Sequence, residues 1–272
     1  MSERLVIIFF WLAFMAYAAA FIFYLYLFFN KRQIMGVLAV SLTALGFLFH
    51  TISFGARWVS VGYIPLEGAF ESYSMFAWAV VLIYLTLMWK SELKVLGAWL
   101  MPFVGVLLGI SWVKYESPER LSEVVKNTWI ILHVTVVFLA YAGFTIAAVL
   151  ALLYLIQQRQ LKKRHVNLFF RRLPALEVLD DWSNRAISMA LPFMTMTIIT
   201  GMIRAIKDFP SWYYDPFVIS TTLTWFLFGL YVALRYLRDW QGRRIAYMAI
   251  AGFASIFLIQ VMKVFSGFHQ FG

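Results

Sequence analysis

The sequence contains no cysteine, and this absence excludes several kinds of site at once. Disulfides, iron–sulfur clusters and metal sites built on thiolates all require cysteine. Charged residues are also scarce, at 13% of the 272 residues, whereas a soluble globular chain carries about 25%. Hydrophobic residues make up 63% of the chain and recur in runs of about 20 residues. This composition predicts an all-α integral membrane protein.

Eight of the apolar runs are long enough to cross a membrane as helices. The predicted spans are 5–29, 36–54, 70–89, 95–113, 128–157, 184–206, 217–237 and 245–265. The first run is too long and too aromatic for a signal peptide, and no small-residue cleavage site follows it, so we expect it to remain as a helix. The chain is therefore predicted to form a bundle of about eight transmembrane helices, in a single polytopic membrane domain over 1–272.

The charged residues are unevenly divided between the two sets of predicted loops. One set has 15 basic and 5 acidic residues, a net charge of +10, whereas the other set has 8 of each. By the positive-inside rule the basic side faces the cytoplasm. Both termini are then expected on the outer side of a bacterial cytoplasmic (inner) membrane, together with the loops 55–69, 114–127 and 207–216. Topology in the lipid bilayer accounts for the net charge, and no nucleic-acid partner is predicted.

Three polar segments do not fit a membrane span. Residues 116–126 are predicted to form a helix on the outer surface, and 167–182 an interfacial helix interrupted near Pro174. The basic loop 159–172 has two interpretations, a docking site for a soluble partner or positive-inside charge attracted to anionic lipid. No charged pair and no pair of broken helices is expected deep in the spans, which argues against a small-molecule transporter.

An aromatic stretch, Trp212-Tyr213-Tyr214, precedes Asp215-Pro216 between two apolar runs. Pro216 fixes its own φ and biases Asp215 away from helix, so a helix is predicted to begin here. Aromatic residues at such a boundary commonly anchor a helix at the lipid headgroups. The alternative is an aromatic shelf for a flat, hydrophobic ligand such as a porphyrin.

The four histidines differ in position. His165 lies in the basic loop and is expected to be a solvated residue. His133 lies about one turn into the fifth span and His269 just after the eighth, so both are expected near the outer face. Each is either structural or a ligand, since imidazole is a common ligand of metals and of haem iron. His50 lies within the second span, where it is expected either to have a ligand role or to hydrogen-bond a neighbouring helix.

Several motifs resemble those of a known family. They are G-Y-I-P-L-E-G-A-F-E-S at 62–72, W-I-I-L-H-V at 129–134, L-P-A-L-E-V-L-D at 173–180 with R-A-I-S at 185–188, P-F at 192–193, T-G at 200–201 and G-F-H-Q-F-G at 267–272. This set is similar to the CcsA/ResC branch of the cytochrome c assembly family, the haem-handling proteins that carry a tryptophan-rich WWD domain. The resemblance covers most of the chain.

The resemblance implies a haem b site on the outer face. The positions that match the family's outer histidines are His133 and His269, which would be the axial ligands of the haem iron. Trp212, Tyr213, Tyr214 and Trp225 would supply stacking area. Asp215 would cap a helix or orient a ligand.

The WWD loop, at about 207–225, is eroded in this sequence. Asp208-Phe209 stands where the family has W-G, and Phe217, Val218, Ile219 and Ser220 replace its K-E-T-W. Tyr63 replaces an outer histidine. Ala233 stands at the position of a histidine within the membrane, which leaves His50 as the imidazole that would substitute inside a span.

Two functions follow from the resemblance. The first is a haem-handling protein of cytochrome c biogenesis, which presents haem for attachment to apocytochrome c beside a CcsB/ResB-like membrane partner. Such a protein is at most part of a haem-attachment complex. The alternative is a HemX-like, non-catalytic membrane regulator or scaffold of tetrapyrrole biosynthesis.

Overall fold

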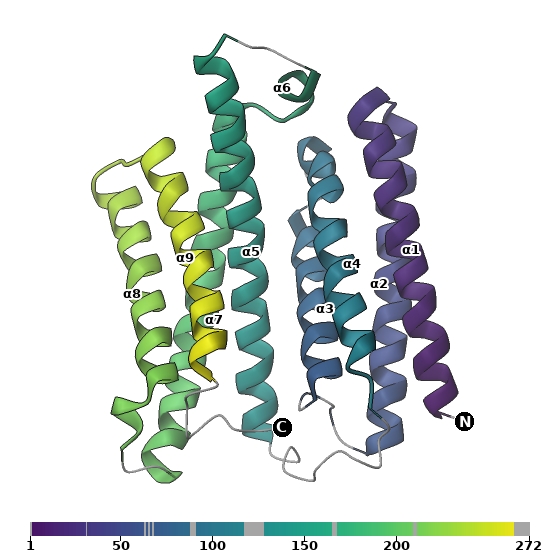
Figure 1. The fold of residues 1–272 in the computed structure, drawn as a ribbon, viewed down its shortest axis with the longest axis vertical. Helices are drawn as coiled ribbons and strands as arrows, with labels where there is room; N and C mark the ends of the chain where they lie inside the picture. Colours follow the sequence, from purple (N-terminus) through teal and green to yellow (C-terminus); the bar gives the residue numbers. More distant parts are fainter. Residues whose placement is uncertain are drawn as a thin grey trace. The chain divides into compact units, whose positions relative to one another are not determined.

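A computed structural model of the chain describes residues 2–30, 32–62, 64, 66, 68–87, 91–116, 128–164, 168–208 and 211–263. The described residues are mostly helical, with no β-strand among them (Figure 1). The chain divides into two compact units, unit 1 over Met1–Ile131 and unit 2 over Leu132–Gly272. The all-α class predicted from composition is confirmed, while a single domain over 1–272 stays a prediction.

Unit 1 contains four long helices and one 3-10 segment. They are α1 (Ser2–Asn30), α2 (Gln33–Val61), α3 (Ala69–Leu87), η1 (Ser91–Leu96) and α4 (Gly97–Val113). Helix α1 packs along α2 over most of its length and also contacts α4, which in turn packs on α3. The last turns of α2 and α4 and the first turn of α3 lie at the end of unit 1 where α1 begins (Figure 1).

The interface between α1 and α2 follows a seven-residue repeat. In α2 the buried residues alternate at steps of three and four, namely Gly36, Ala39, Thr43, Gly46, His50, Ser53 and Arg57. In α1 the same steps separate Val6, Phe10, Ala13, Tyr17, Ala20, Tyr24 and Leu27. This spacing is that of a left-handed coiled coil. Large side chains of α1 pack against small residues of α2. For example, the Tyr17 ring lies against Gly46.

Unit 2 contains most of α5 and the helices that follow it. They are α5 (Thr128–Lys162), α6 (Leu168–Arg172), α7 (Leu176–Asp208), η4 (Trp212–Tyr214), α8 (Pro216–Leu237) and α9 (Arg243–Lys263). Helices α5 and α7 approach closely where Gly143 meets Ala190, and Ser183 donates a hydrogen bond to the Ala147 carbonyl over 3.0 Å. The rings of Phe144 and Phe228 stack at 3.7 Å with an angle of 5° between them. Close packing of this kind replaces the hydrophobic effect as the force that holds helices together in lipid.

Seven helices in the described part of the chain are long and apolar enough to cross a membrane. They coincide with the first seven predicted spans. The eighth predicted span, 245–265, corresponds to α9, a helix of 21 residues that is not among the seven. The side of the membrane on which the termini lie stays a prediction.

The boundary between the predicted interfacial helix and the sixth span differs from the structure. The helix expected on the inner surface at 167–182 is interrupted at Pro174 as predicted, but its second half is continuous with α7, which begins at Leu176. No glycine or proline separates 176 from 191, and Asp181 pairs with Arg185 one turn later at 2.8 Å, so the helix continues into the span. The segment predicted as a surface helix, 116–126, lies outside the described residues apart from Glu116.

Candidate functional site

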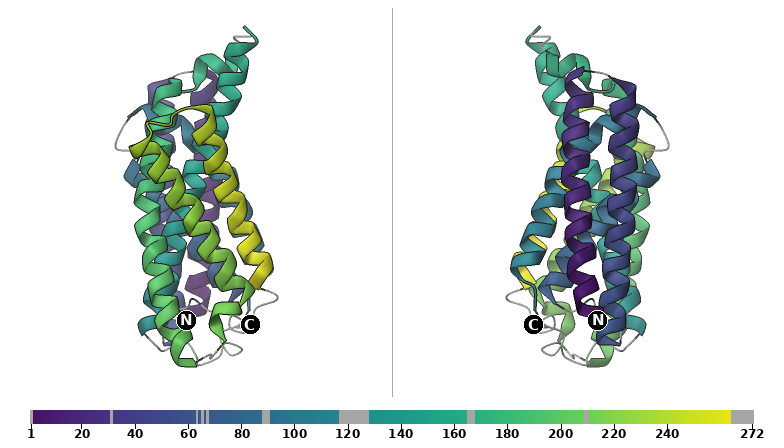
Figure 2. Two further views of the ribbon diagram at one scale, coloured as in Figure 1. Left: turned by 90° about the vertical axis from the view of Figure 1, so that its left-hand side faces the viewer. Right: turned by 90° about the vertical axis from the view of Figure 1, so that its right-hand side faces the viewer.

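Five of the predicted site residues of unit 2, His133, Trp212, Tyr213, Tyr214 and Asp215, lie at or near helix ends on one side of the unit. The first turns of α5 and α8 and the last turns of α7 and α9 are at one end of unit 2, and η4 joins α7 to α8 there (Figures 1 and 2). Helix α5 brings His133 to this end and η4 brings Trp212, Tyr213 and Tyr214. His269, the second predicted iron ligand, lies outside the described residues, and so does His165.

The imidazole of His133 is partly exposed and is held by helix α7. Its Nδ1 lies 2.8 Å from the Thr200 hydroxyl oxygen. Thr200 is nearly buried, at 8% exposure, and its hydroxyl also lies 2.7 Å from the Met196 carbonyl and 3.1 Å from the Thr197 carbonyl. The ring is therefore fixed by a side chain from the neighbouring helix, as is common for imidazoles that bind metals.

Gly201 has no side chain and therefore leaves room for the His133 ring beside helix α7. A Cβ atom built on Gly201 would lie 3.1 Å from His133 Cε1, which is tighter than nearly all real contacts of a Cβ atom. The imidazole thus rests against the backbone of α7. Thr200-Gly201 was noted above only as part of the family pattern, and the structure now gives both residues a physical role.

The three aromatic rings of η4 do not form one flat surface. Trp212 and Tyr213 are perpendicular, with ring centroids 6.0 Å apart and an angle of 89° between the planes, and Tyr213 and Tyr214 are tilted by 47°. Tyr213 is 54% exposed and Tyr214 73% exposed. In this arrangement one ring at a time can stack on a flat macrocycle. Exposed tyrosines at a helix end also suit the anchoring role at the lipid headgroups.

Asp215 begins helix α8. Its Oδ1 accepts hydrogen bonds from the backbone N–H groups of Phe217 at 2.9 Å and Val218 at 3.3 Å, and Pro216 occupies the first helical position. This is an N-cap, in which a side-chain oxygen satisfies backbone donors that have no partner within the helix. The first of the two roles predicted for Asp215 is confirmed, and the negative charge also complements the positive end of the helix dipole.

Trp225 is not part of the η4 cluster. It lies nine residues after Pro216, which is about 13 Å along the helix axis at 1.5 Å per residue. Its indole N–H donates to the Thr195 hydroxyl on α7 over 2.9 Å. Trp225 therefore joins α8 to α7 within the span, and the structure separates it from the residues with which the sequence had grouped it.

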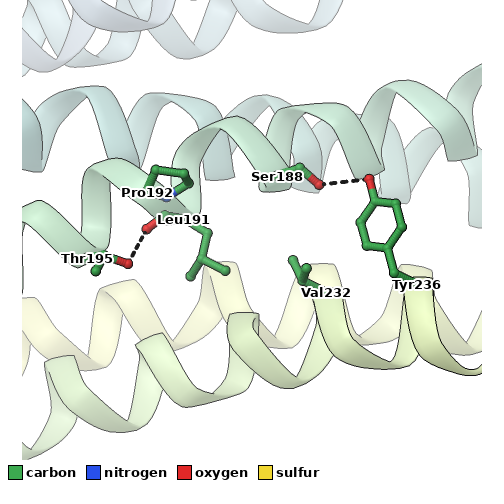
Figure 3. A pocket seen from close by; sticks show the side chains of 6 residues that line it. All are labelled: Ser188, Leu191, Pro192, Thr195, Val232 and Tyr236. Atoms are coloured by element: carbon green, nitrogen blue, oxygen red, sulfur yellow. Dashed lines mark hydrogen bonds between the residues drawn. The ribbon is translucent and has the colours of Figure 1, made fainter.

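A groove of about 510 Å³ lies between α7 and α8 (Figure 3). Its lining residues are Ser188, Leu191, Pro192, Thr195, Val232 and Tyr236. Figure 3 shows the hydroxyls of Ser188 and Tyr236 pointing toward each other, with 3.4 Å between the oxygens. Ala233, at the position of the family's membrane histidine, follows Val232 in this helix, and no histidine lines the groove.

His50 is enclosed within unit 1, and its exposed fraction is zero. Its Nε2 lies 2.8 Å from the Ser74 hydroxyl of α3, and its Nδ1 lies 3.5 Å from the Tyr17 hydroxyl of α1. Both ring nitrogens thus have a polar neighbour on another helix. This geometry favours the hydrogen-bonded interpretation of His50, one of the two that the sequence left open.

Unit 1 also contains a buried ion pair that the sequence analysis missed. Arg57 and Glu71 are 1% and 2% exposed, and the Arg57 Nε and Nη2 atoms donate to Glu71 Oε1 over 3.0 and 2.8 Å. Arg57 Nη2 also donates to the Glu116 carbonyl over 2.8 Å. The guanidinium lies over the rings of both Phe70 and Tyr115, at 5.6 and 5.3 Å from their centroids.

This ion pair joins three helix ends, those of α2, α3 and α4. Burial raises the pKa of the Tyr115 phenol, so the ring beside Arg57 is neutral. Arg57 falls in the predicted outer loop 55–69, because the second span was predicted to end at 54, whereas α2 continues to Val61. The sequence did offer one signal for this ion pair. Arg57 and Glu71 are only 14 residues apart and have opposite charges.

The described residues of unit 2 fit the chemistry of a haem site. A partly exposed imidazole whose Nδ1 contacts a side chain of a neighbouring helix suits the role of an axial ligand, and exposed tyrosines at the same end offer aromatic area. Haem brings its own four equatorial nitrogens, so the protein needs to supply only one or two ligands. His133 would supply one of them.

The comparisons with known proteins agree with these motifs. The model of the family described as "Cytochrome C assembly protein" matches residues 66–269. The chain is 28% identical to "Cytochrome c biogenesis protein CcsA" of Guillardia theta, over 92% of this chain and 90% of the relative. It is 26% identical to the protein of the same name from Microcystis aeruginosa, over 80% of this chain and 82% of the relative.

Proposed function

Because this chain belongs to the cytochrome c assembly protein family, we propose that it binds haem at the outer membrane face and presents it for attachment to apocytochrome c. The observation that carries the proposal is the imidazole of His133, fixed on α7 by Thr200 and Gly201. It occupies the family's histidine position before the aromatic loop. It also lies at the end of unit 2 where the exposed tyrosines of η4 are found.

In this proposal the protein positions its cargo. His133 and His269 are the axial ligands of the haem iron, and Tyr213 or Tyr214 stacks on the macrocycle. Asp215 fixes the first turn of α8 and thereby the position of η4. Haem supplies the vinyl groups to which the cysteine thiols of apocytochrome c add, with sulfur and hydrogen joining the two carbons of each double bond.

The proposal includes a location and a partner. We place the chain in a bacterial cytoplasmic membrane, as one polytopic domain with the η4 end of unit 2 on the outer side, because the opposite loops carry the positive charge. A CcsB/ResB-like membrane protein is the expected partner. It would receive apocytochrome c, for which this chain has no large outer domain among its described residues.

Absorption spectroscopy of the purified protein tests the proposal. We expect a low-spin haem spectrum that weakens or disappears in His133→Ala and in His269→Ala, and that returns when imidazole is added. His165→Ala serves as the control, since that histidine lies in the basic loop, and it should retain the wild-type spectrum. If the double variant of His133 and His269 keeps the wild-type Soret and α bands, the ligand assignment is wrong.

A second candidate function is a non-catalytic regulator of tetrapyrrole biosynthesis. It is favoured by the contacts of His50, whose nitrogens both have a polar neighbour within unit 1, and by Ala233 at the membrane histidine position. A regulator needs no inner ligand to receive haem from the membrane. Cells that lack this protein, with normal c-type cytochromes but altered porphyrin levels, would establish the second function over the first.

A further inference from the structure

We propose that Thr200 holds His133 in the tautomer whose proton is on Nδ1, so that Nε2 is the nitrogen offered to haem iron. The proposal deepens the haem site described above and, in its second half, rests on that proposed function. The first half concerns this chain alone. It depends on which atom carries the proton in the 2.8 Å contact between His133 and Thr200.

A threonine hydroxyl has one proton and can accept through its lone pairs. The Thr200 oxygen lies 2.7 Å from the Met196 carbonyl oxygen and 3.1 Å from the Thr197 carbonyl oxygen. Two oxygens 2.7 Å apart attract each other only when a proton lies between them, because otherwise their lone pairs repel. The Thr200 hydroxyl therefore donates its proton to the Met196 carbonyl one turn earlier, as is usual for threonine within a helix.

The direction of the second hydrogen bond follows from the first. Since the Thr200 proton points to the carbonyl, its oxygen can only accept from the imidazole, and Nδ1 must carry the hydrogen that it donates. The reverse arrangement, with Thr200 donating to Nδ1, would leave the 2.7 Å contact without a proton. In a neutral imidazole with a proton on Nδ1, the lone pair that can bind a metal is on Nε2.

This arrangement has two consequences for an iron ligand. It removes the competing tautomer, in which Nε2 carries hydrogen and cannot bind the metal. It also makes Nε2 more basic, because the Nδ1–H group donates to an oxygen that is itself polarised. Thr200 is accordingly a positioning residue, which acts on haem through His133.

The tautomer can be measured without haem. We would label the protein with ¹⁵N-histidine, record ¹⁵N spectra in lipid nanodiscs at a pH where the ring is neutral, and assign His133 by its loss in His133→Gln. We expect the signal of a protonated Nδ1 and an unprotonated Nε2. In Thr200→Val the two tautomers should become mixed, whereas Thr200→Ser should retain the wild-type signal. A wild-type ring protonated on Nε2 would overturn the proposal, even if Thr200→Val failed to fold.

Thr197→Val is a matched control. Thr197 lies in the same helix, is also 8% exposed, and its hydroxyl likewise donates to a carbonyl one turn earlier, that of Phe193 at 3.0 Å. This variant removes the same hydroxyl group from a residue for which no contact with His133 is found in the described structure. It should leave both the tautomer and the haem affinity unchanged.

The second measurement is haem affinity together with the reduction potential. We expect Thr200→Val to weaken haem binding by about 10–100-fold, the range typical for loss of a group that orients a metal-binding histidine. The potential should become more positive, since a less basic imidazole stabilises ferric iron less. Thr200→Ser should retain the wild-type affinity and potential.

Two outcomes would contradict the proposal. Wild-type values in Thr200→Val would refute the role of Thr200. A wild-type protein that binds no haem, yet shows the expected tautomer, would refute the proposed function and leave the tautomer assignment standing.

Discussion

Two consecutive residues of α7 hold the His133 ring by different means. Thr200 contributes a hydroxyl at 2.8 Å, and Gly201 contributes space, because a Cβ atom there would lie 3.1 Å from the ring carbon Cε1. The ring is therefore constrained both in its rotation and in its distance from the helix. This pair explains in physical terms why threonine and glycine suit these positions.

Gly201→Ala should displace the His133 ring by a few tenths of an ångström, because the added methyl group crowds Cε1. We expect weaker haem retention on gel filtration and a change in the Soret band. The control is Gly229→Ala in α8, where nothing lies within 4 Å of the added carbon and alanine favours the helix by about 0.5–1 kcal/mol. Haem retention equal to wild type in Gly201→Ala would show that the ring tolerates the displacement.

The buried ion pair of unit 1 predicts a large effect on stability. Glu71→Gln removes the charge that neutralises Arg57, so a buried guanidinium remains without a counter-ion, and the loss is expected to be about 3–5 kcal/mol. Thermal unfolding in detergent measures it. Asp181→Asn, which breaks the half-exposed pair with Arg185, should change stability by less than about 1 kcal/mol. Similar melting temperatures for the two variants would contradict the assignment.

At the residue scale the sequence predicted some roles and concealed others. His133 and Asp215 were identified because imidazole and an Asp-Pro pair carry chemical and conformational signals of their own. The hydroxyl of Thr200 gave no such signal, since threonine within an apolar run ordinarily bonds its own helix. The predicted helix start at Pro216 already implied that Trp225 lies nine residues along that helix, but the family motif grouped Trp225 with the aromatic residues before Pro216.

At the element scale, apolar length alone predicted where helices form. It did not predict which face of a helix is buried, because α1 is apolar on all sides and a lipid-facing residue resembles a packed one. Helix α2 did carry the information, since its small and polar residues recur at steps of three and four, from Gly36 to Arg57. Such residues are avoided where a helix faces lipid, so their repeat marks the seam with α1.

Gly46→Ala tests this seam. A Cβ atom at Gly46 would lie 2.7 Å from the Tyr17 ring, so the two helices must separate or the ring must move, at a cost of about 1–3 kcal/mol. Gly55→Ala in the same helix meets nothing within 4 Å and should be neutral or slightly stabilising. The unfolding temperatures of the two variants give the comparison, and equal values would place the seam elsewhere.

At the scale of the whole molecule, charge predicts orientation and packing does not. The basic loops net +10 and the opposite loops net zero, which predicts both termini on the outer side. We expect alkaline phosphatase fused after Gly272 to be active and a cytoplasmic reporter at the same place to be silent. Activity of the cytoplasmic reporter alone would reverse the orientation and move the His133 site to the inner face.

His50 is the residue at which passage of haem through the membrane can be tested. As an inner ligand of haem it stays a prediction, and its contacts offer a structural role instead, since an unpaired polar group at membrane depth costs several kcal/mol. Glutamine separates the two roles, because an amide can replace the hydrogen bond to Ser74 at 2.8 Å but cannot take the place of imidazole on iron.

We expect His50→Gln to leave the yield of c-type cytochromes close to that of wild type, because the His50 side chain is fully buried and hydrogen-bonded on two sides. His50→Ala should lower the yield only as far as it destabilises unit 1, so the loss should parallel the fall in melting temperature. Haem staining of c-type cytochromes, in cells that carry only the variant protein, measures the yield. His133→Ala in the same cells should abolish the staining without a matching loss of stability. If His50→Gln also abolishes it while the protein folds normally, His50 binds haem within the membrane, and haem reaches the outer site through unit 1.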